Sequence, residues 1–196
     1  MSLIDEAELA QLNERFGPGR CRQVSIDTAR SGSEYWHRKL IAKSLRGEVV
    51  LAIQRPDGQV LLHTKSFYPG GVFRLLTGRI HAGEPVLSGA MREVREETGL
   101  PVTVEHFLGW VQFEFRCEDR QVPFVSYVFL MWTGNRPPVP EDNSELISGF
   151  RYVPPGELSR VAEQLRSLPP DWAEWGAFRA PAHDMVADAL RSVKHE

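Results

Sequence analysis

Three glutamates, Glu93, Glu96 and Glu97, lie within five positions of a 196-residue chain whose net charge is only −3. On a helix, the spacing i, i+3, i+4 places the three carboxylates side by side on one face, where they repel one another. Grouped carboxylate oxygens are the ligands that Mg²⁺ and Mn²⁺ prefer. The pattern therefore predicts a divalent-cation site, because a bound cation turns this repulsion into coordination.

A solvated charged face is the alternative interpretation, with Arg92 and Glu96 as an ordinary i, i+4 pair. The crowding of like charges argues against it, and so does Gly89, a mid-helix glycine on the same side. Such a glycine costs up to about 1 kcal/mol relative to alanine. It suggests that some group must approach the helix backbone closely there.

The helix that carries these acids has clear sequence boundaries. Pro85 suits a first helical position, Gly99 suits a left-handed stop, and Pro101 prevents continuation. A helical wheel predicts a stripe that faces the core. Its members are Leu87, Ala90, Met91, Val94 and Thr98.

Strand and helix patterns alternate along the rest of the chain. A hairpin is predicted where two apolar runs, 49–53 and 60–62, flank the turn residues Pro56-Asp57-Gly58. Further segments have strand or helix patterns. The strands are expected at 102–116, 122–133 and 148–154, and the helices at 2–17, 155–168 and 180–193. This order predicts an α/β protein with a mixed sheet.

Composition excludes several classes of protein. With 23 basic and 26 acidic residues, the chain has no basic excess for binding nucleic acid. No apolar run approaches the roughly 20 residues of a membrane span, and the acidic first 20 residues do not resemble a signal peptide. Cys21 and Cys117 lie too far apart in sequence to suggest a metal pair or a disulfide framework. A cytoplasmic protein is expected.

The segment from Gly78 to Leu100 resembles the Nudix box, whose pattern is G-x5-E-x7-R-E-U-x-E-E-x-G-U with U an aliphatic residue. All nine specified positions are met. They are Gly78, Glu84, Arg92, Glu93, Val94, Glu96, Glu97, Gly99 and Leu100. So many matches at fixed spacing are far more specific than a lone glycine-rich motif.

The resemblance implies an α/β/α sandwich around a mixed sheet and metal-dependent hydrolysis of a nucleoside diphosphate derivative. It implies that Glu93, Glu96 and Glu97 bind Mg²⁺ or Mn²⁺ together with the backbone carbonyl of Gly78. Arg92 would orient the acids. Glu84 would support the loop or favour the helix dipole, and Gly99 has a structural role. The general base would be Glu93 or a later loop glutamate, Glu145 before Glu141.

The resemblance also suggests a domain division and a substrate class. Residues 1–45 would form an N-terminal helix and arm, and residues 46–196 the Nudix hydrolase domain with C-terminal helices. An arm of this length resembles ADP-ribose and nucleotide-sugar hydrolases, where it often builds a homodimer. However, Phe115 and Arg116 stand where ADP-ribose hydrolases often have a proline.

The substrate would be a small-molecule nucleotide. Arg74 and Arg79 are candidates to hold its phosphates, and Tyr68 and Phe73 are candidates to stack on its base. The tryptophan-rich segment 171–190 is expected to be a helix that packs on the sheet.

Two other functions stay open. The chain could be a Nudix-fold sensor that binds a nucleotide without hydrolysing it, although the complete set of acids argues for catalysis. It could also be an isoprenyl diphosphate isomerase, which shares the fold and needs a cysteine. Cys117 is the one candidate for that role, without the additional histidine-rich metal ligation that this chemistry uses.

Overall fold

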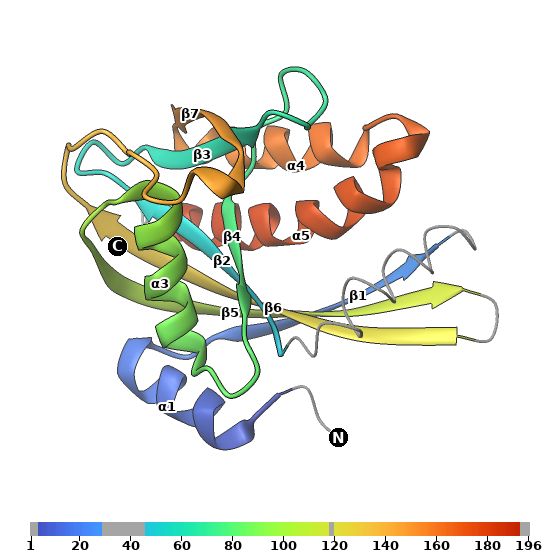
Figure 1. Ribbon diagram of the computed structural model, residues 1–196. Helices are drawn as coiled ribbons and strands as arrows, with labels where there is room; N and C mark the ends of the chain where they lie inside the picture. The colour runs from blue at the N-terminus through green and yellow to red at the C-terminus, as the bar shows by residue number, and fades with distance from the viewer. Residues whose placement is uncertain (1–3, 29–45, 118–119, 193–196) are drawn as a thin grey trace.

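In the computed structural model, which describes residues 4–28, 46–117 and 120–192, a seven-stranded mixed sheet forms the middle layer (Figure 1). The strands are β1 (Arg20–Asp27), β2 (Gly47–Gln54), β3 (Val60–Lys65), β4 (Leu76–Ile80), β5 (Val102–Cys117), β6 (Arg120–Thr133) and β7 (Ile147–Val153). Their order is β1-β5-β6-β2-β3-β7, and β4 pairs with β2 beside this row. The pairs β1–β5 and β2–β6 are parallel, and the other pairs are antiparallel.

Helices cover both faces of this sheet. They are α1 (Glu6–Phe16), α3 (Val86–Thr98), α4 (Leu158–Arg166) and α5 (Pro170–Ser192). Because β2 is buried throughout, its alternating side chains show the layers. Val49 and Leu51 join the apolar cluster under α1 and α3, whereas Val50 and Ala52 join the cluster under α4 and α5. The predicted α/β/α sandwich around a mixed sheet is confirmed.

Helix α3 begins one residue after the predicted start, ends before Gly99 as predicted, and buries a different face. Pro85 is extended and precedes the helix, and Gly99 adopts a left-handed conformation with φ of 59°. Met91, predicted in the core, is 40% exposed, whereas Glu93 and Glu97 are buried. The wheel gives the angles between side chains but not the side that packs. Here the helix lies against the sheet with part of its acidic face.

The N-terminal segment is tied to the rest of the fold. Helix α1 ends at Gly17 as predicted, and β1 extends the sheet by pairing with β5. Glu8 on α1 accepts a hydrogen bond of 2.6 Å from the N–H of Val86 and pairs with Arg46, so α1 caps the start of α3. Most of the predicted arm, residues 29–45, lies outside the described residues, and the division at residue 46 stays a prediction.

Helix α5 is longer than predicted. It runs without a break through Pro181, so the tryptophan-rich segment and the last predicted helix are one element. His183 connects α5 to the segment before β4. It is buried, and its Nε2 accepts a 3.0 Å hydrogen bond from the N–H of Leu75. His183 Nδ1 lies 2.9 Å from the carbonyl oxygen of Arg179, to which it donates in that tautomer. Within the described part of the chain, no helix is long and apolar enough to cross a membrane.

This buried histidine makes the fold sensitive to acid. Burial lowers the pKa of His183 to about 3, from an unfolded value near 6.5. Because the folded protein keeps the ring neutral, its contribution to stability is complete above pH 6.5 and is lost as pH falls. The free energy of unfolding should therefore drop on the order of 2 kcal/mol between pH 7.5 and pH 5 from this group. Urea unfolding at both pH values measures the drop.

The variant His183→Gln isolates the effect, because glutamine retains an acceptor for Leu75 but does not titrate. It should show a smaller drop than the wild type, although buried His63, whose pKa is also lowered by burial, still contributes. The exposed His106→Gln is the matched control and should behave like the wild type. Equal drops in His183→Gln and wild type would contradict the assignment.

Candidate active site

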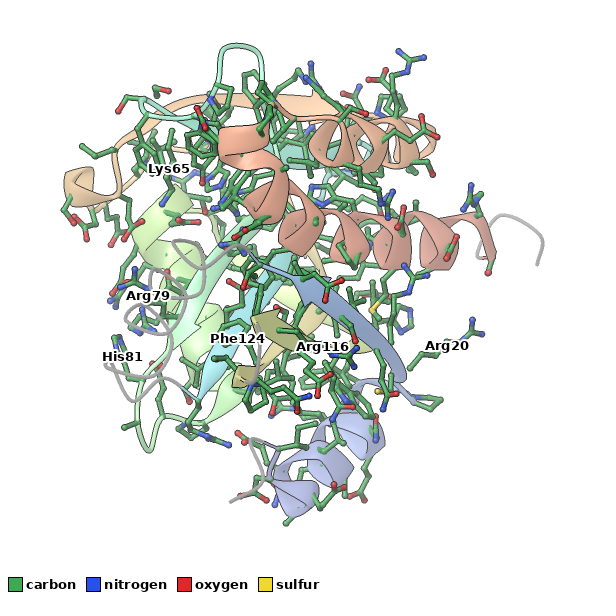
Figure 2. All side chains as sticks on the ribbon, turned by 90° about the vertical axis from the view of Figure 1, so that its right-hand side faces the viewer. Arg20, Lys65, Arg79, His81, Arg116 and Phe124 are labelled. Atoms are coloured by element: carbon green, nitrogen blue, oxygen red, sulfur yellow. The ribbon has the colours of Figure 1, made fainter. Side chains whose placement is uncertain are left out.

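A cavity of about 430 Å³ lies beside the second half of α3, the loop after β3 and the start of α5. Figure 2 shows Lys65, Arg79 and His81 on this side of the molecule, away from Arg20. Most side chains around it are charged or aromatic. The lining residues are Glu48, Lys65, Phe67, Tyr68, Arg74, Thr77, Gly78, Arg79, His81, Arg92, Glu93, Glu96, Glu145, Trp172, Trp175 and Arg179.

Arg92 links the acids of the motif to one another. Its Nε and Nη2 donate to the two oxygens of Glu84 at 2.8 and 2.9 Å. Its Nη1 donates to Glu93 at 2.8 Å and to Glu96 at 3.0 Å, and Nη2 also donates to the carbonyl of Arg79. One guanidinium therefore supplies positive charge to three carboxylates, as its predicted orienting role requires.

Glu84 holds the loop that leads into α3. Besides its two bonds from Arg92, it accepts a hydrogen bond from the N–H of His81. These bonds lower the pKa of Glu84 to about 2, so it stays ionised. A Cβ on Gly89 would lie 3.1 Å from Glu84 Oε2, so this carboxylate is the group that approaches the helix backbone.

Glu97 is fully buried at the end of the acidic face. Lys65 Nζ lies 3.3 Å from its Oε1 and His63 Nδ1 lies 3.9 Å from its Oε2, but neither oxygen accepts a hydrogen bond. Burial raises the pKa of Glu97 to about 7, although Lys65 and Arg74 attract the charged form. A buried carboxylate without hydrogen bonds is costly, so this site favours an additional cation.

Glu93 fills the space beside Gly78 of β4. A Cβ on Gly78 would lie 1.9 Å from Cγ of Glu93 and 2.4 Å from its Oε2, so only glycine fits here. Burial raises the pKa of Glu93, while the bond from Arg92 opposes that change. The motif thus needs a glycine at its first position for space.

Glu145 reaches the cavity from a separate loop. It ends the short 3-10 helix Asn143–Glu145, and Lys65 pairs with it as well as with Glu97. The next residue, Leu146, has a φ of 54°, a left-handed conformation that non-glycine residues rarely adopt. The carbonyl of Leu146 accepts a hydrogen bond from Ser66, which helps to hold this strained turn at the cavity. Glu141 is exposed, pairs with Arg95 and does not line the cavity.

The structure brings together three of the four predicted substrate-binding residues. Arg79 and Tyr68 line the cavity, and so does Arg74, which is 3% exposed. Arg74 donates to the Tyr68 hydroxyl, the carbonyl of Leu75 and the Thr77 hydroxyl, which are all neutral. Phe73 is not brought to the cavity, because its ring packs under Arg151 of β7 instead.

Several cavity residues were not predicted from sequence. Trp172, Trp175 and Arg179 enter from α5, and Lys65 enters from β3. Buried Glu48 holds Arg179 through two bonds, at 2.7 and 2.8 Å, and accepts a third from Ser126. The available signal was the i, i+3, i+7 spacing of the three α5 residues, which places them on one helix face.

The donor set fits a hard divalent cation. It consists of carboxylate oxygens, and both oxygens of Glu97 are buried without a hydrogen bond. As the side chains stand, however, no three acidic, histidine or cysteine side chains of the described residues converge on one point. Arg92 and Lys65 supply the positive charge between the acids in this structure. They offset the repulsion that was expected, from the sequence, to be offset by a bound cation. The side chain of Cys117, the candidate for the isomerase function, lies outside the described part.

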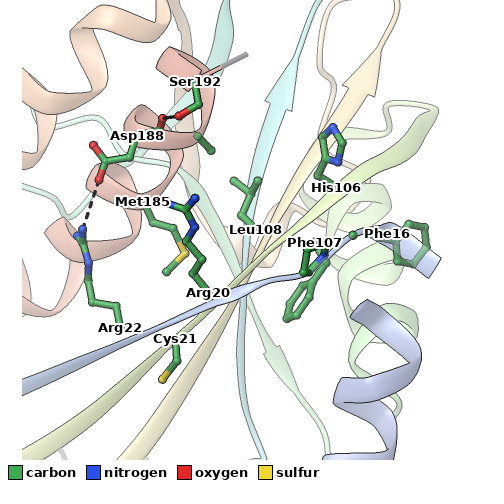
Figure 3. Close-up of a pocket in the computed structure, with 13 residues that line it drawn as sticks. Phe16, Arg20, Cys21, Arg22, His106, Phe107, Leu108, Met185, Asp188 and Ser192 are labelled. Carbon is green, nitrogen blue, oxygen red and sulfur yellow. Dashed lines mark hydrogen bonds and ion pairs between the residues drawn. The ribbon is translucent and has the colours of Figure 1, made fainter. Parts of the chain in front are cut away.

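A second cavity, of about 330 Å³, lies between β1, β5 and the end of α5 (Figure 3). It contains none of the motif residues. Arg22 extends toward α5, where it pairs with Asp184 and Asp188, so its charge is already compensated. The chemistry predicted from the motif therefore belongs to the first cavity.

Comparisons with known proteins give a short sequence match and several similar folds. A segment of 47 residues is 47% identical to an octanoyltransferase of Myxococcus xanthus, covering 24% of this chain and only 13% of that protein. The E. coli dihydroneopterin triphosphate pyrophosphohydrolase is 17% identical with a TM-score of 0.48, over 72% of this chain and 94% of the other. A C. elegans Ap4A hydrolase is 18% identical with a TM-score of 0.49, over 74% and 98%. At these values the similarities carry no information on substrate.

The family comparison covers more than half of the chain. Residues 44–175 match the NUDIX domain, a range that includes the complete motif and the acids around Arg92. Enzymes of this family hydrolyse diphosphate bonds of small-molecule nucleotide substrates and generally need divalent metal ions. The chain therefore belongs to the Nudix family.

Proposed function

We propose that this chain hydrolyses a nucleoside diphosphate linked to a second group, such as ADP-ribose or a nucleotide sugar, and releases a nucleoside monophosphate. The observation that carries the proposal is Glu97, whose two buried oxygens have no hydrogen bond and lie beside Glu93 in the motif helix. Lys65 lies 3.3 Å from one of them without donating a hydrogen bond, so both oxygens remain available to a ligand.

In this proposal Glu93, Glu96, Glu97 and the carbonyl of Gly78 hold Mg²⁺ or Mn²⁺. The ion neutralises diphosphate oxygens and makes water more acidic. Arg92 positions Glu93 and Glu96 through its hydrogen bonds. The protein's own contribution is thus to hold these acids in place.

We assign the general base to Glu145, with Glu93 as the alternative. Glu93 is buried and bonded to Arg92, which limits its access to water. Glu145 is 38% exposed, lines the cavity from another element and is held by Lys65. The strained turn at Leu146 is a backbone cost of the kind often found at functional sites.

Arg74 and Arg79 are proposed to bind the phosphates. The support is strongest for Arg74, a buried guanidinium whose hydrogen bonds all go to neutral oxygens. A buried guanidinium that donates its hydrogen bonds only to neutral groups favours an anionic ligand. The homodimer expected from the N-terminal arm also belongs to this proposal and rests on the family resemblance.

The test is a panel of ADP-ribose, a nucleotide sugar, a dinucleoside polyphosphate and a nucleoside triphosphate, each incubated with Mg²⁺ or Mn²⁺. Nucleoside monophosphate should appear from ADP-ribose or the nucleotide sugar, and EDTA should abolish the reaction. Tight binding of ADP-ribose without product under either metal would favour a sensor. Conversion of isopentenyl diphosphate to its isomer would favour the isomerase.

A further inference from the structure

The aromatic residues at the start of α5 are only partly buried. Trp172 and Trp175 are half-buried and line the same cavity as Glu93 and Glu96. Their ring centroids are 5.2 Å apart, and those of Trp175 and Tyr68 are 4.9 Å apart. Phe67, which packs edge-on against Tyr68, is 55% exposed. An aromatic cluster that is open on one side is a surface for a flat ligand.

The cations beside this cluster indicate which ligand. The guanidinium of Arg74 lies 5.9 Å from the ring centroid of Trp175 and 5.4 Å from that of Tyr68. Arg179 follows Trp175 by one helical turn and lines the same cavity. The positive charge of Arg74 therefore adjoins the rings, and Glu93 and Glu96 line the same cavity. A molecule that spans these groups has an aromatic ring at one end and phosphates next to it.

We infer that Trp172 and Trp175 of α5, together with Tyr68, form the platform on which the aromatic base of a nucleoside diphosphate stacks. This inference deepens the proposed function and rests on it for the position of the diphosphate. The planes of the two tryptophans are 84° apart, so the base stacks on one ring and meets the edge of the other. This contact selects for a nucleoside over a diphosphate that lacks a base. The matched NUDIX domain ends at Trp175, so most of α5 lies beyond it.

Calorimetric titration with ADP and with inorganic pyrophosphate, both in EDTA, tests the platform without catalysis. Trp172→Leu and Trp175→Leu should each weaken ADP binding about 5- to 100-fold. Pyrophosphate binding should stay within threefold of the wild type. Trp172→Phe, which keeps a stacking ring, should restore most of the ADP affinity. Trp132→Leu removes a 42% exposed tryptophan outside the cavity and should bind ADP like the wild type.

Unchanged ADP binding in both leucine variants would overturn the inference, as would an equal loss of ADP and pyrophosphate binding. A wild type that binds no ADP would overturn it as well. The proposed function fails separately, if the panel yields no hydrolysis with either metal. In that case a tryptophan-dependent affinity for ADP would still support the platform.

Discussion

Replacing Glu97 by glutamine is expected to lower kcat roughly a thousandfold, because a neutral amide cannot supply the charge that a divalent ion requires. The fold should survive, since glutamine has almost the same shape in this fully buried position. In the metal-free protein, the variant should melt at the same or a higher temperature than the wild type at pH 8. The reason is that burial raises the pKa of Glu97 to about 7, so its charged form is unfavourable there.

Steady-state kinetics with ADP-ribose and Mg²⁺, together with thermal melts in EDTA, measure both effects. Glu105→Gln is the matched control, because it makes the same change on an exposed glutamate of β5 outside the cavity. Its kcat and melting temperature should equal those of the wild type. Turnover by Glu97→Gln within tenfold of the wild type would show that Glu97 does not hold the ion.

The second large effect is expected from Gly78→Ala. Alanine keeps the backbone carbonyl, but its Cβ would overlap Glu93, with separations of 1.9 Å from Cγ and 2.0 Å from Cδ. Glu93 must then move away from Arg92, and kcat should fall about 100-fold or more. Overpacking of this kind also costs about 1–3 kcal/mol of stability.

Gly70→Ala serves as the control, since a Cβ there meets no atom within 4 Å and Gly70 has no positive φ. It should leave kcat within twofold and the melting temperature unchanged. If Gly78→Ala kept full activity, the space next to Glu93 would have no catalytic importance.

The sequence was most informative where local chemistry determines the backbone conformation. Gly99 ends α3 because its left-handed φ is accessible mainly to glycine, and the same logic located the end of α1 at Gly17. The hairpin strands followed from apolar runs around turn residues. These are short-range effects, so neighbouring residues were enough to predict them.

Tertiary packing limited the rest. Periodicity located the acids of α3 on one face but did not reveal that the sheet buries Glu93 and Glu97 and leaves Met91 exposed. Lys65 stands between Glu97 and Glu145, which are distant from it in sequence. No local sequence pattern predicts such a contact, because it depends on how β3, α3 and the loop before β7 pack together.

The same limit applied to the substrate side of the cavity. Helices were predicted at 171–190 and at 180–193, yet α5 is one element that continues through Pro181. Trp172 and Trp175 reach the cavity as part of it. Phe73 precedes Arg74 in sequence, but the two side chains point to different neighbours, Arg151 and Tyr68 respectively. Adjacent residues of an extended segment face opposite sides, so only the pairing of the strands decides which one reaches the ligand.

The acids around Arg92 are proposed to bind a divalent ion. Crystals of the wild type and of Glu97→Gln grown with Mn²⁺ test it most directly, through the anomalous scattering of manganese. Manganese should be bound by Glu97 together with Glu93 or Glu96 in the wild type, and it should be absent from the variant. Saturating Mn²⁺ that leaves these side chains on Arg92 and Lys65, with no anomalous peak among them, would contradict it.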